Sequence, residues 1–194
     1  MEKIEKILGR KEWANLLQQP IDVKGKTILI TGASGSIGQQ LIKRLSKSKC
    51  KIIATDIVDC KLKLDVTSKE SIKKFIKYKP DYIVHLAGAK HAPKGEDETI
   101  ETFTINTIGT QLLLKSFPKS KFVLTSTCKA CNPETAYGAS KLIAERLVLN
   151  SGNSVARFYN VVQTSGNVFE IWKKQKQKQV APLCSRYFLS LIHI

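Results

Sequence analysis

The sequence predicts an α/β fold, a doubly wound parallel sheet followed by an incomplete C-terminal lobe. Short β-branched runs alternate with longer amphipathic stretches over most of the 194 residues, a pattern typical of parallel strands connected by helices. A glycine-rich turn separates the first such run from the first amphipathic stretch. With 42% hydrophobic and 25% charged residues, the chain has ordinary globular composition, sufficient for one sizeable core.

The first half of the chain begins with a strand expected at 27–31, an uninterrupted run of Ile, Leu and Thr. The amphipathic stretch 37–46 predicts the first helix, and the apolar run 51–55 predicts the second strand. A helix is expected over 68–77, with Ser68 as its N-cap. Its apolar face, at helical spacing, comprises Ile72, Phe75 and Ile76.

The second half repeats this order. A strand is expected at 81–86, a long helix at 98–116 and a strand at 121–125, followed by a helix at 137–150 and a strand at 154–157. Right-handed crossovers would place these strands in one parallel sheet. This main domain spans 25–162. Residues 1–24 are expected to form a helical lead-in, and 163–194 the start of a second, smaller lobe in which the chain stops.

The charge balance is strongly basic, with 32 Lys and Arg against 16 Asp and Glu, a net charge of +16. Lysines are scattered along the chain and aromatic residues make up 7%, whereas nucleic-acid sites favour Arg and interleaved aromatics. We therefore expect a solvated Lys-rich surface and no nucleic-acid partner; an anionic small molecule is a further possibility. A charged N-terminus without an apolar stretch behind it, and no apolar run of ~20 residues, predict a cytoplasmic protein.

Five cysteines, an odd number, favour a reducing compartment. Cys128 and Cys131 have the CxxC spacing of a redox pair or of half a zinc site. The remaining cysteines and the three histidines do not supply a second ligand pair at the usual spacing. We expect no metal.

The glycine-rich turn has the context of a dinucleotide site. Gly32, Gly35 and Gly38 follow a strand and open a helix. Glycine here permits the tight turn, backbone approach to a pyrophosphate and close helix packing, while the helix N-terminus attracts phosphate. The residues between the glycines that we assign to the site are Ser34, Ser36 and Ile37.

Later strand ends extend this site. Asp56 lies 24 residues after Gly32, near the spacing of a carboxylate that binds the adenine ribose and disfavours a 2′-phosphate. NAD is therefore expected, with NADP less favoured. Asp65 and Val66 are placed near the adenine. Small residues close the next strand beneath the cofactor, namely Ala87, Gly88 and Ala89.

A candidate catalytic pair lies further along. Tyr137 and Lys141 have the YxxxK spacing, which places both on one helix face. A nearby ammonium would lower the pKa of the phenol, preparing Tyr137 to take a hydroxyl proton. Thr127, at the end of the preceding strand, would hold the reacting oxygen.

Several stretches together resemble one family. The turn 32–38, Ala89-Lys-His-Ala-Pro93, Asn106-Thr-Ile-Gly-Thr110, Ser126-Thr-Cys-Lys-Ala-Cys-Asn-Pro133 and Arg157-Phe-Tyr-Asn-Val161 are similar to motifs of extended short-chain dehydrogenases. The likeness is to the CapD-like polysaccharide-biosynthesis group, which includes UDP-N-acetylglucosamine 4,6-dehydratases. It covers nearly the whole chain and implies a Rossmann fold.

The resemblance implies a reaction on a UDP-sugar. Tyr137 and NAD would oxidise the C4 hydroxyl, Lys129 would remove the C5 proton, and hydride would return to C6 as water leaves. Many members carry an Asp as the acid where this chain has Cys128, a weaker acid. The resemblance assigns Asn106 to the cofactor region, although such an Asn also bridges backbone. It places four residues near the sugar, Lys90, His91, Arg157 and Asn160.

Two alternatives remain open at this point. A nucleotide-sugar 4-epimerase needs the Tyr/Lys redox step without an acid at Cys128. A non-catalytic nucleotide-binding protein would need neither Tyr137 nor Lys141. The resemblance further implies a homo-oligomer.

Overall fold

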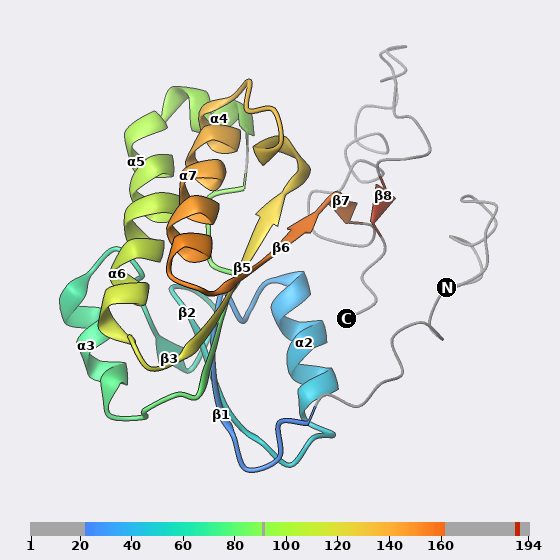
Figure 1. The fold of residues 1–194 in the computed structure, drawn as a ribbon, viewed down its shortest axis with the longest axis vertical. Coiled ribbons are helices and arrows are strands. Elements are labelled where there is room, and N and C mark those ends of the chain that lie inside the picture. The colour runs from blue at the N-terminus through green and yellow to red at the C-terminus, as the bar shows by residue number, and fades with distance from the viewer. Residues whose placement is uncertain (1–21, 91, 162–188, 191–194) are drawn as a thin grey trace. The chain divides into compact units, whose positions relative to one another are not determined.

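The computed structural model describes residues 22–90, 92–161 and 189–190 (Figure 1). A compact unit comprises Val23–Phe158. A second unit contains two short parallel strands, β7 (Asn160–Val161) and β8 (Leu189–Ser190). The helical lead-in expected before residue 22, and most of the lobe expected over 163–194, lie outside the described residues.

A six-stranded parallel sheet forms the centre of the compact unit, in the order β3-β2-β1-β4-β5-β6. This is the strand order of a dinucleotide-binding doubly wound sheet. Outward from β1 the chain builds the sheet first on one side, through β2 and β3, and then on the other, from β4 to β6, so the order of the strands reverses between β1 and β4. The strands are β1 (Thr27–Thr31), β2 (Lys51–Asp56), β3 (Leu62–Lys63), β4 (Tyr82–His85), β5 (Lys121–Thr127) and β6 (Ser154–Phe158).

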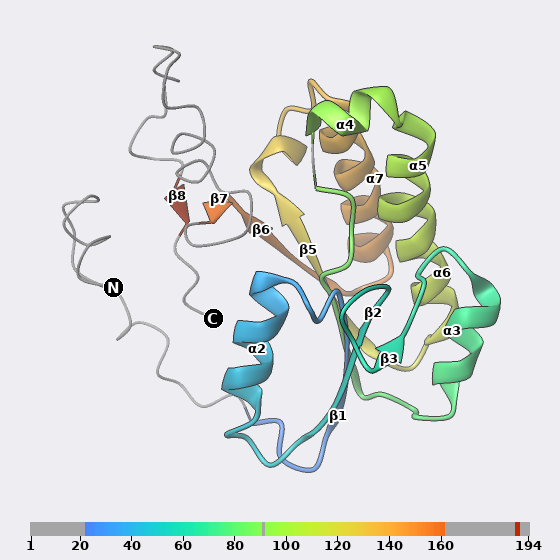
Figure 2. The ribbon, with the colours of Figure 1, turned by 180° about the vertical axis from the view of Figure 1, so that it is seen from behind.

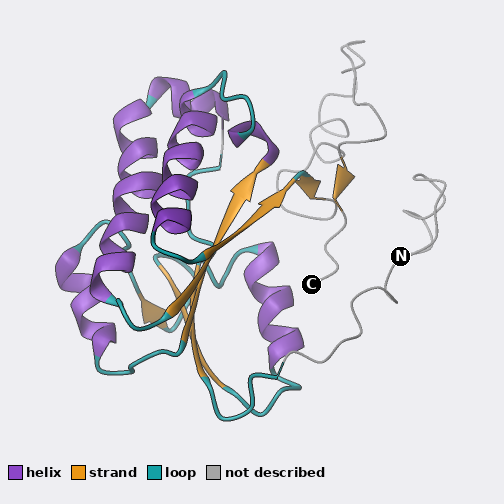
Figure 3. Ribbon diagram, in the orientation of Figure 1, coloured by secondary structure: helices purple, strands orange, loops and turns teal. Residues whose placement is uncertain are grey.

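Helices cover both faces of this sheet (Figures 1 and 2). One face is covered by α2, and the opposite face by a layer in which α3 packs on α6 and α7 packs on α5 and α6. Figure 3 distinguishes the helices from the strands of the sheet by colour. The helices are α2 (Ser36–Leu45), α3 (Lys69–Ile76), α4 (Ala92–Asp97), α5 (Thr99–Phe103), α6 (Gly109–Ser116) and α7 (Ala136–Asn150), with a π-helical segment η2 (Thr104–Ile108) and a 3₁₀ turn η3 (Cys128–Ala130).

The hydrophobic core includes apolar side chains of β1, β2, β4 and β5, with others from α3, α6 and α7. Leu29, Ile83 and Leu124 come from three adjacent strands and are at most 1% exposed. Leu113 of α6 and Val148 of α7 close the cluster from the helical layer, both fully buried. Such burial of both sheet faces explains why the strands are continuous apolar runs.

The predicted fold class is confirmed, and Ser68 caps α3 as predicted, accepting a 3.1 Å bond from the Ser71 amide. Ile76 was predicted on the buried face of α3 but is 44% exposed, because it ends the helix. The long helix predicted over 98–116 is divided by η2. Sequence analysis missed β3 and α4, whose two and six residues are too short for a periodic signal. Within the described residues, no helix is long and apolar enough to cross a membrane.

Candidate active site at the carboxyl edge of the sheet

The glycine-rich turn meets the end of β4 at the point where the strand order reverses. Gly32 has a φ of +69°, and a Cβ there would lie 2.5 Å from the Ala87 nitrogen. A Cβ on Gly38 would lie 2.6 Å from the carbonyl oxygens of Gly32 and Ala33. Both positions therefore require glycine, the first for backbone conformation and strand contact, the second for helix packing.

The N-terminus of α2 fits a phosphate group. Its N-cap, Gly35, is extended and provides no side-chain cap, and the described first turn, which includes Ser36 and Ile37, holds no acidic residue. The positive end of the helix dipole is therefore not offset by a local carboxylate. These features match the pyrophosphate of a dinucleotide, the group implied by the sequence.

Asp56 ends β2 beside the glycine turn. One carboxylate oxygen accepts a 3.1 Å bond from the Ser34 amide and a further bond from the Ser34 hydroxyl. The other accepts a 2.8 Å bond from the Ile57 amide. The carboxylate is thus fixed next to the turn, where it would meet the adenine ribose of a dinucleotide.

Asp65 and Val66 lie in the loop before α3. The Asp65 carboxylate accepts bonds from the amide and hydroxyl of Thr67, at 2.8 and 2.7 Å. Val66 is buried against Gly109, where a Cβ would come within 2.9 Å of the valine methyl Cγ2. Gly109 therefore lets the start of α6 pack against this loop.

Asn106 joins three segments of the site. Its Nδ2 donates to the Ala89 carbonyl oxygen at 3.1 Å and to the Ser140 hydroxyl at 3.0 Å. Asn106 is 1% exposed, and its Oδ1 is buried without a hydrogen-bond partner among the described residues. A Cβ on Gly88 would lie 2.8 Å from that oxygen. Asn106 thus bridges backbone, as one expectation had it, and leaves an acceptor beneath Gly88.

A buried histidine of β4 that sequence analysis did not assign to the site links β1 to α6. The Thr110 hydroxyl donates its proton to the Asn106 carbonyl at 2.6 Å. It must therefore accept from His85 Nε2, 3.1 Å away, which leaves His85 Nδ1 to accept from the Thr31 hydroxyl at 2.7 Å. Burial, with a smaller effect of Lys141, lowers the pKa of His85 to about 3, so this imidazole is neutral.

Tyr137, at the start of α7, lies beside the turn that follows β5. Its phenol lies close enough to Thr127 for that side chain to lower its pKa, and the Thr127 hydroxyl accepts a 3.3 Å bond from the Lys129 amide. Lys129 Nζ lies 5.8 Å from the centroid of the Tyr137 ring. Three of the residues predicted to be catalytic, Thr127, Lys129 and Tyr137, therefore lie near one another, with the half-buried Cys128 between the first two in sequence.

The predicted lowering of the Tyr137 pKa is wrong for this structure. Burial raises the pKa of Tyr137, and the hydrogen bond to Thr127 offsets this in part. Lys141, the expected partner, instead donates from Nζ to the carbonyl oxygen of Thr125 at 2.9 Å. Burial of Lys141 lowers its own pKa to about 8, although the charge of Glu145 opposes the shift.

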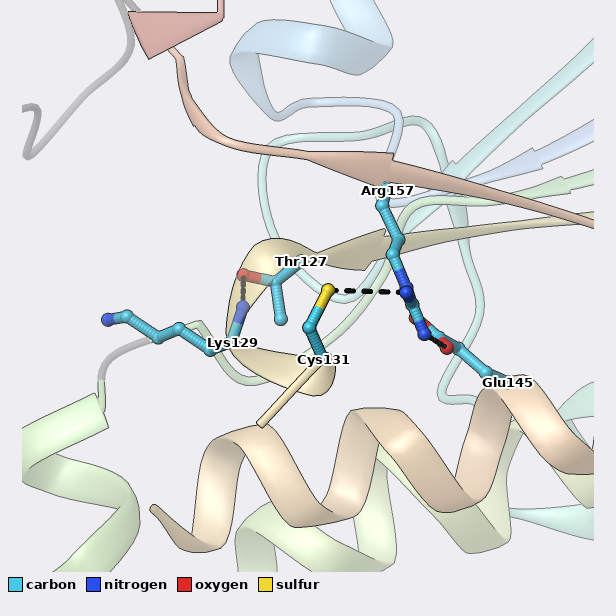
Figure 4. Close-up of polar contacts among 5 residues, drawn as sticks. All are labelled: Thr127, Lys129, Cys131, Glu145 and Arg157. Atoms are coloured by element: carbon cyan, nitrogen blue, oxygen red, sulfur yellow. Dashed lines mark hydrogen bonds and ion pairs between the residues drawn. The ribbon is translucent and has the colours of Figure 1, made fainter. Parts of the chain in front are cut away.

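Arg157 has partners that the sequence did not indicate (Figure 4). Its Nε donates to Glu145 Oε1 at 2.8 Å and its Nη2 to Glu145 Oε2 at 2.5 Å. Burial alone would raise the pKa of Glu145, but these bonds from Arg157 hold it below its ordinary value. Nη1 of Arg157 donates to Cys131 Sγ at 3.2 Å. The four-residue spacing of Lys141 and Glu145 is the signal by which Glu145 could have been found.

Three further residues were predicted near a sugar. Lys90 is exposed in the loop after β4. His91 lies outside the described residues. Asn160 begins β7 in the second unit, and its side chain lies outside the described part of the chain.

Comparison with known proteins identifies the family. A model of the family described as polysaccharide biosynthesis protein matches residues 54–192. The chain belongs to this family. The match includes Asp56, Lys129, Tyr137 and Lys141, so family membership and the grouping of side chains rest on the same segment.

Three curated relatives illustrate the range of proteins around this family. An uncharacterized membrane protein of Methanocaldococcus jannaschii is 34% identical over 80% of this chain and 55% of its own length. A UDP-N-acetylglucosamine 4,6-dehydratase (inverting) of Campylobacter jejuni is 31% identical over 77% of this chain and 53% of its own. A UDP-glucose 4-epimerase of Rickettsia rickettsii is 28% identical over 86% and 60%. The chain thus spans little more than half the length of these relatives.

Solved structures show the same fold. A dTDP-4-dehydrorhamnose reductase of Clostridium acetobutylicum superposes with a TM-score of 0.69 at 26% identity, over 76% of this chain and 58% of that one. The fold expected from the resemblance to extended short-chain dehydrogenases is confirmed.

Proposed function

We propose that this chain carries the cofactor-binding and catalytic part of a nucleotide-sugar 4,6-dehydratase that acts on UDP-N-acetylglucosamine or a similar UDP-sugar. One observation carries the proposal: Thr127, Lys129 and Tyr137 meet at the carboxyl end of β5. The dinucleotide turn stands at the carboxyl end of β1 in the same parallel sheet. Ligands of such sheets bind along this edge.

The chemistry that NAD supplies when bound is the transfer of hydride: it is taken from the sugar C4 and returned to C6. The residues of the chain perform the proton transfers. Tyr137 takes the proton of the C4 hydroxyl, and the Thr127 hydroxyl, close to the phenol, holds the sugar oxygen. Buried Lys141 places positive charge in the same helix. Lys129, exposed beside the Tyr137 ring, removes the C5 proton that the new ketone acidifies.

Cys128 occupies the position from which a proton would reach the departing C6 hydroxyl. A thiol with a reference pKa near ~8.5 donates less readily than a carboxylic acid. This favours 4-epimerisation as the second candidate, since that reaction uses Tyr137 without an acid at position 128. The Rickettsia relative supports keeping both reactions in view.

Mass spectrometry of UDP-N-acetylglucosamine incubated with the protein and NAD separates these reactions. Loss of one water from the sugar nucleotide supports the dehydratase, while an isomer of unchanged mass would replace it with the epimerase. Tyr137→Phe should abolish either conversion and still bind NAD in calorimetry. If the native protein binds NAD but converts no UDP-sugar under any condition, the catalytic proposal fails in favour of a binding protein.

We further propose a cytoplasmic homo-oligomer assembled through α5 and α7. These two helices pack together and expose Ile100 at 81%, Ile143 at 43% and Leu149 at 47%. Exposed apolar side chains on adjacent helices favour protein contact. Sedimentation should show Ile100→Glu shifting the protein toward the monomer, whereas Ile57→Glu, at a 63% exposed loop position, should leave assembly unchanged.

A further inference from the structure

The turn η3 brings two cysteines into register. The Cys131 amide donates to the Cys128 carbonyl oxygen at 3.0 Å, so the two residues stand three apart in a 3₁₀ turn. Side chains at this spacing eclipse one another, and a rise of ~2.0 Å per residue separates their Cα atoms by ~6 Å along the axis. Disulfides form at Cα separations of ~4.4–6.8 Å. The Cα separation is therefore within the range of a disulfide, and a small adjustment of the turn brings the two Cβ atoms to the ~3.8 Å that the bond requires.

The sulfur of Cys131 has a different environment from that of two other cysteines. Cys50 and Cys60 donate S–H to backbone carbonyls, those of Leu45 at 3.6 Å and Ala54 at 3.3 Å. Cys131 instead accepts a bond from a guanidinium, Nη1 of Arg157. It is also exposed, whereas Cys50 and Cys60 are half-buried.

Arg157 cannot easily turn away from Cys131. Its Nε and Nη2 are both engaged by Glu145, which is 2% exposed. The fork of the guanidinium therefore directs Nη1 at the sulfur, as Figure 4 shows. A cationic donor fixed next to an accessible sulfur is the arrangement that makes a cysteine reactive toward oxidants.

We propose that Cys128 and Cys131 form a reversible dithiol–disulfide site in which Cys131 reacts first. The Cys131 thiolate attacks an oxidant of the disulfide class, such as glutathione disulfide, forming a mixed disulfide and releasing one glutathione thiolate. Cys128 loses its proton to water and attacks the Cys131 sulfur, releasing the second glutathione thiolate. Two electrons pass from the cysteines to glutathione, and excess thiol reverses the sequence.

The position of this site links it to Tyr137. Thr127 and Lys129 flank Cys128 directly, and both contact Tyr137. Closing the disulfide withdraws Cys131 from Arg157 and constrains the turn that carries these side chains. The chemistry of the pair is independent of which reaction the protein catalyses.

The pair is tested by incubating the whole protein with glutathione mixtures, trapping free thiols by alkylation and mapping peptides by mass spectrometry. We expect a Cys128–Cys131 disulfide to form before Cys50 or Cys60 is modified, and reduction to restore both thiols. In Cys128→Ser, glutathione should remain attached to Cys131. Cysteines 128 and 131 that stay reduced while Cys50 or Cys60 reacts would overturn the proposal.

The role of Arg157 has its own test, which does not depend on disulfide formation. Arg157→Lys keeps a cation for Glu145 but loses the fork that reaches Cys131. Alkylation of Cys131 by iodoacetamide should slow by about tenfold, while the rates at Cys50 and Cys60 stay constant and report that the fold is intact. An unchanged rate at Cys131 would show that Arg157 does not activate it.

Discussion

The Thr31 hydroxyl donates to Nδ1 of His85 across 2.7 Å, joining β1 to β4 at the point where the strand order reverses. The opposite ring nitrogen binds Thr110, which in turn binds the backbone of Asn106. The glycine turn and the Asn106 segment are therefore held together by one neutral imidazole. Protonating that ring would put an N–H donor on Nδ1, facing the Thr31 hydroxyl that already donates to it. It would also place a positive charge in the core.

The first prediction concerns acid stability. Burial lowers the pKa of folded His85 to about 3 from an ordinary 6.5, so between these values the unfolded chain binds a proton that the folded chain does not. Stability from this group is complete above about pH 6.5 and is lost as the pH falls toward 3. His85→Gln, which retains a donor toward Thr110, removes this titration.

Urea unfolding at pH 7 and pH 5 measures the effect. Relative to His85→Gln, the native protein should lose about 2 kcal/mol more between the two pH values. Equal losses in both proteins would mean that His85 is protonated in the folded state or exposed to water.

The second prediction separates two reasons why a position requires glycine, a positive φ and a lack of space for a Cβ atom. Gly25 and Gly32 have nearly the same positive φ, +73° and +69°, but a Cβ on Gly25 meets nothing within 4 Å. Gly25→Ala should therefore cost the ~1–2 kcal/mol of left-handed backbone strain. Gly32→Ala adds contacts as close as 2.5 Å with the end of β4, so we expect a larger loss of stability and no NAD binding by calorimetry. Comparable losses in the two variants would contradict the close approach of these loops.

The third prediction concerns the ion pair between α7 and β6. Arg157→Met leaves the Glu145 carboxylate buried without its fork of donors, which should cost about 3 kcal/mol in denaturant unfolding. The exposed pair of Lys94 and Glu98, at 2.9 Å, provides the control. Glu98→Gln should leave the unfolding midpoint unchanged, because solvent screens exposed pairs. A similar small effect at Arg157 would show that water reaches Glu145.

Periodicity and local motifs predicted most of this fold, because β-branched runs and amphipathic helices carry their own signals. The same reasoning grouped Thr127 and Tyr137, which are close in sequence to one strand end, and the family resemblance added Lys129. It missed His85 and Glu145, whose partners lie on other strands or helices and depend on the tertiary arrangement. It also assigned Lys141 to the Tyr137 phenol, where the folded chain offers the Thr125 carbonyl instead. Contacts between residues that only the folded structure brings together leave no local pattern in the sequence.

The fourth prediction concerns cofactor choice. The Asp56 carboxylate is fixed beside the glycine turn by the Ser34 and Ile57 amides, where it would accept bonds from a ribose diol and repel a 2′-phosphate. NAD should bind more tightly than NADP in calorimetric titration. Asp56→Asn should narrow or reverse the difference, and Asp59→Asn, at an exposed position in the loop after β2, should not. Equal affinities in the native protein would remove Asp56 from cofactor selection.

The last prediction concerns the acid at the end of β5. Cys128 follows Thr127 in a turn that contacts Tyr137, and in the proposed dehydration it donates a proton to the departing C6 hydroxyl. Cys128→Asp places a stronger acid there, with a reference pKa of ~3.9 against ~8.5. Water loss from the UDP-sugar should accelerate, while oxidation at C4, followed as transient NADH absorbance, should stay constant because it depends on Tyr137.

Cys131→Ser, on the same turn but directed at Arg157, is the matched control and should leave both steps unchanged under reducing conditions. If Cys128→Asp alters neither the rate of water loss nor the products, the proton comes from elsewhere. If the variant slows C4 oxidation instead, the negative charge at position 128 acts through Tyr137, whose pKa it raises. The two steps are thus assigned separately, because each substitution changes one group on a turn whose other contacts remain in place.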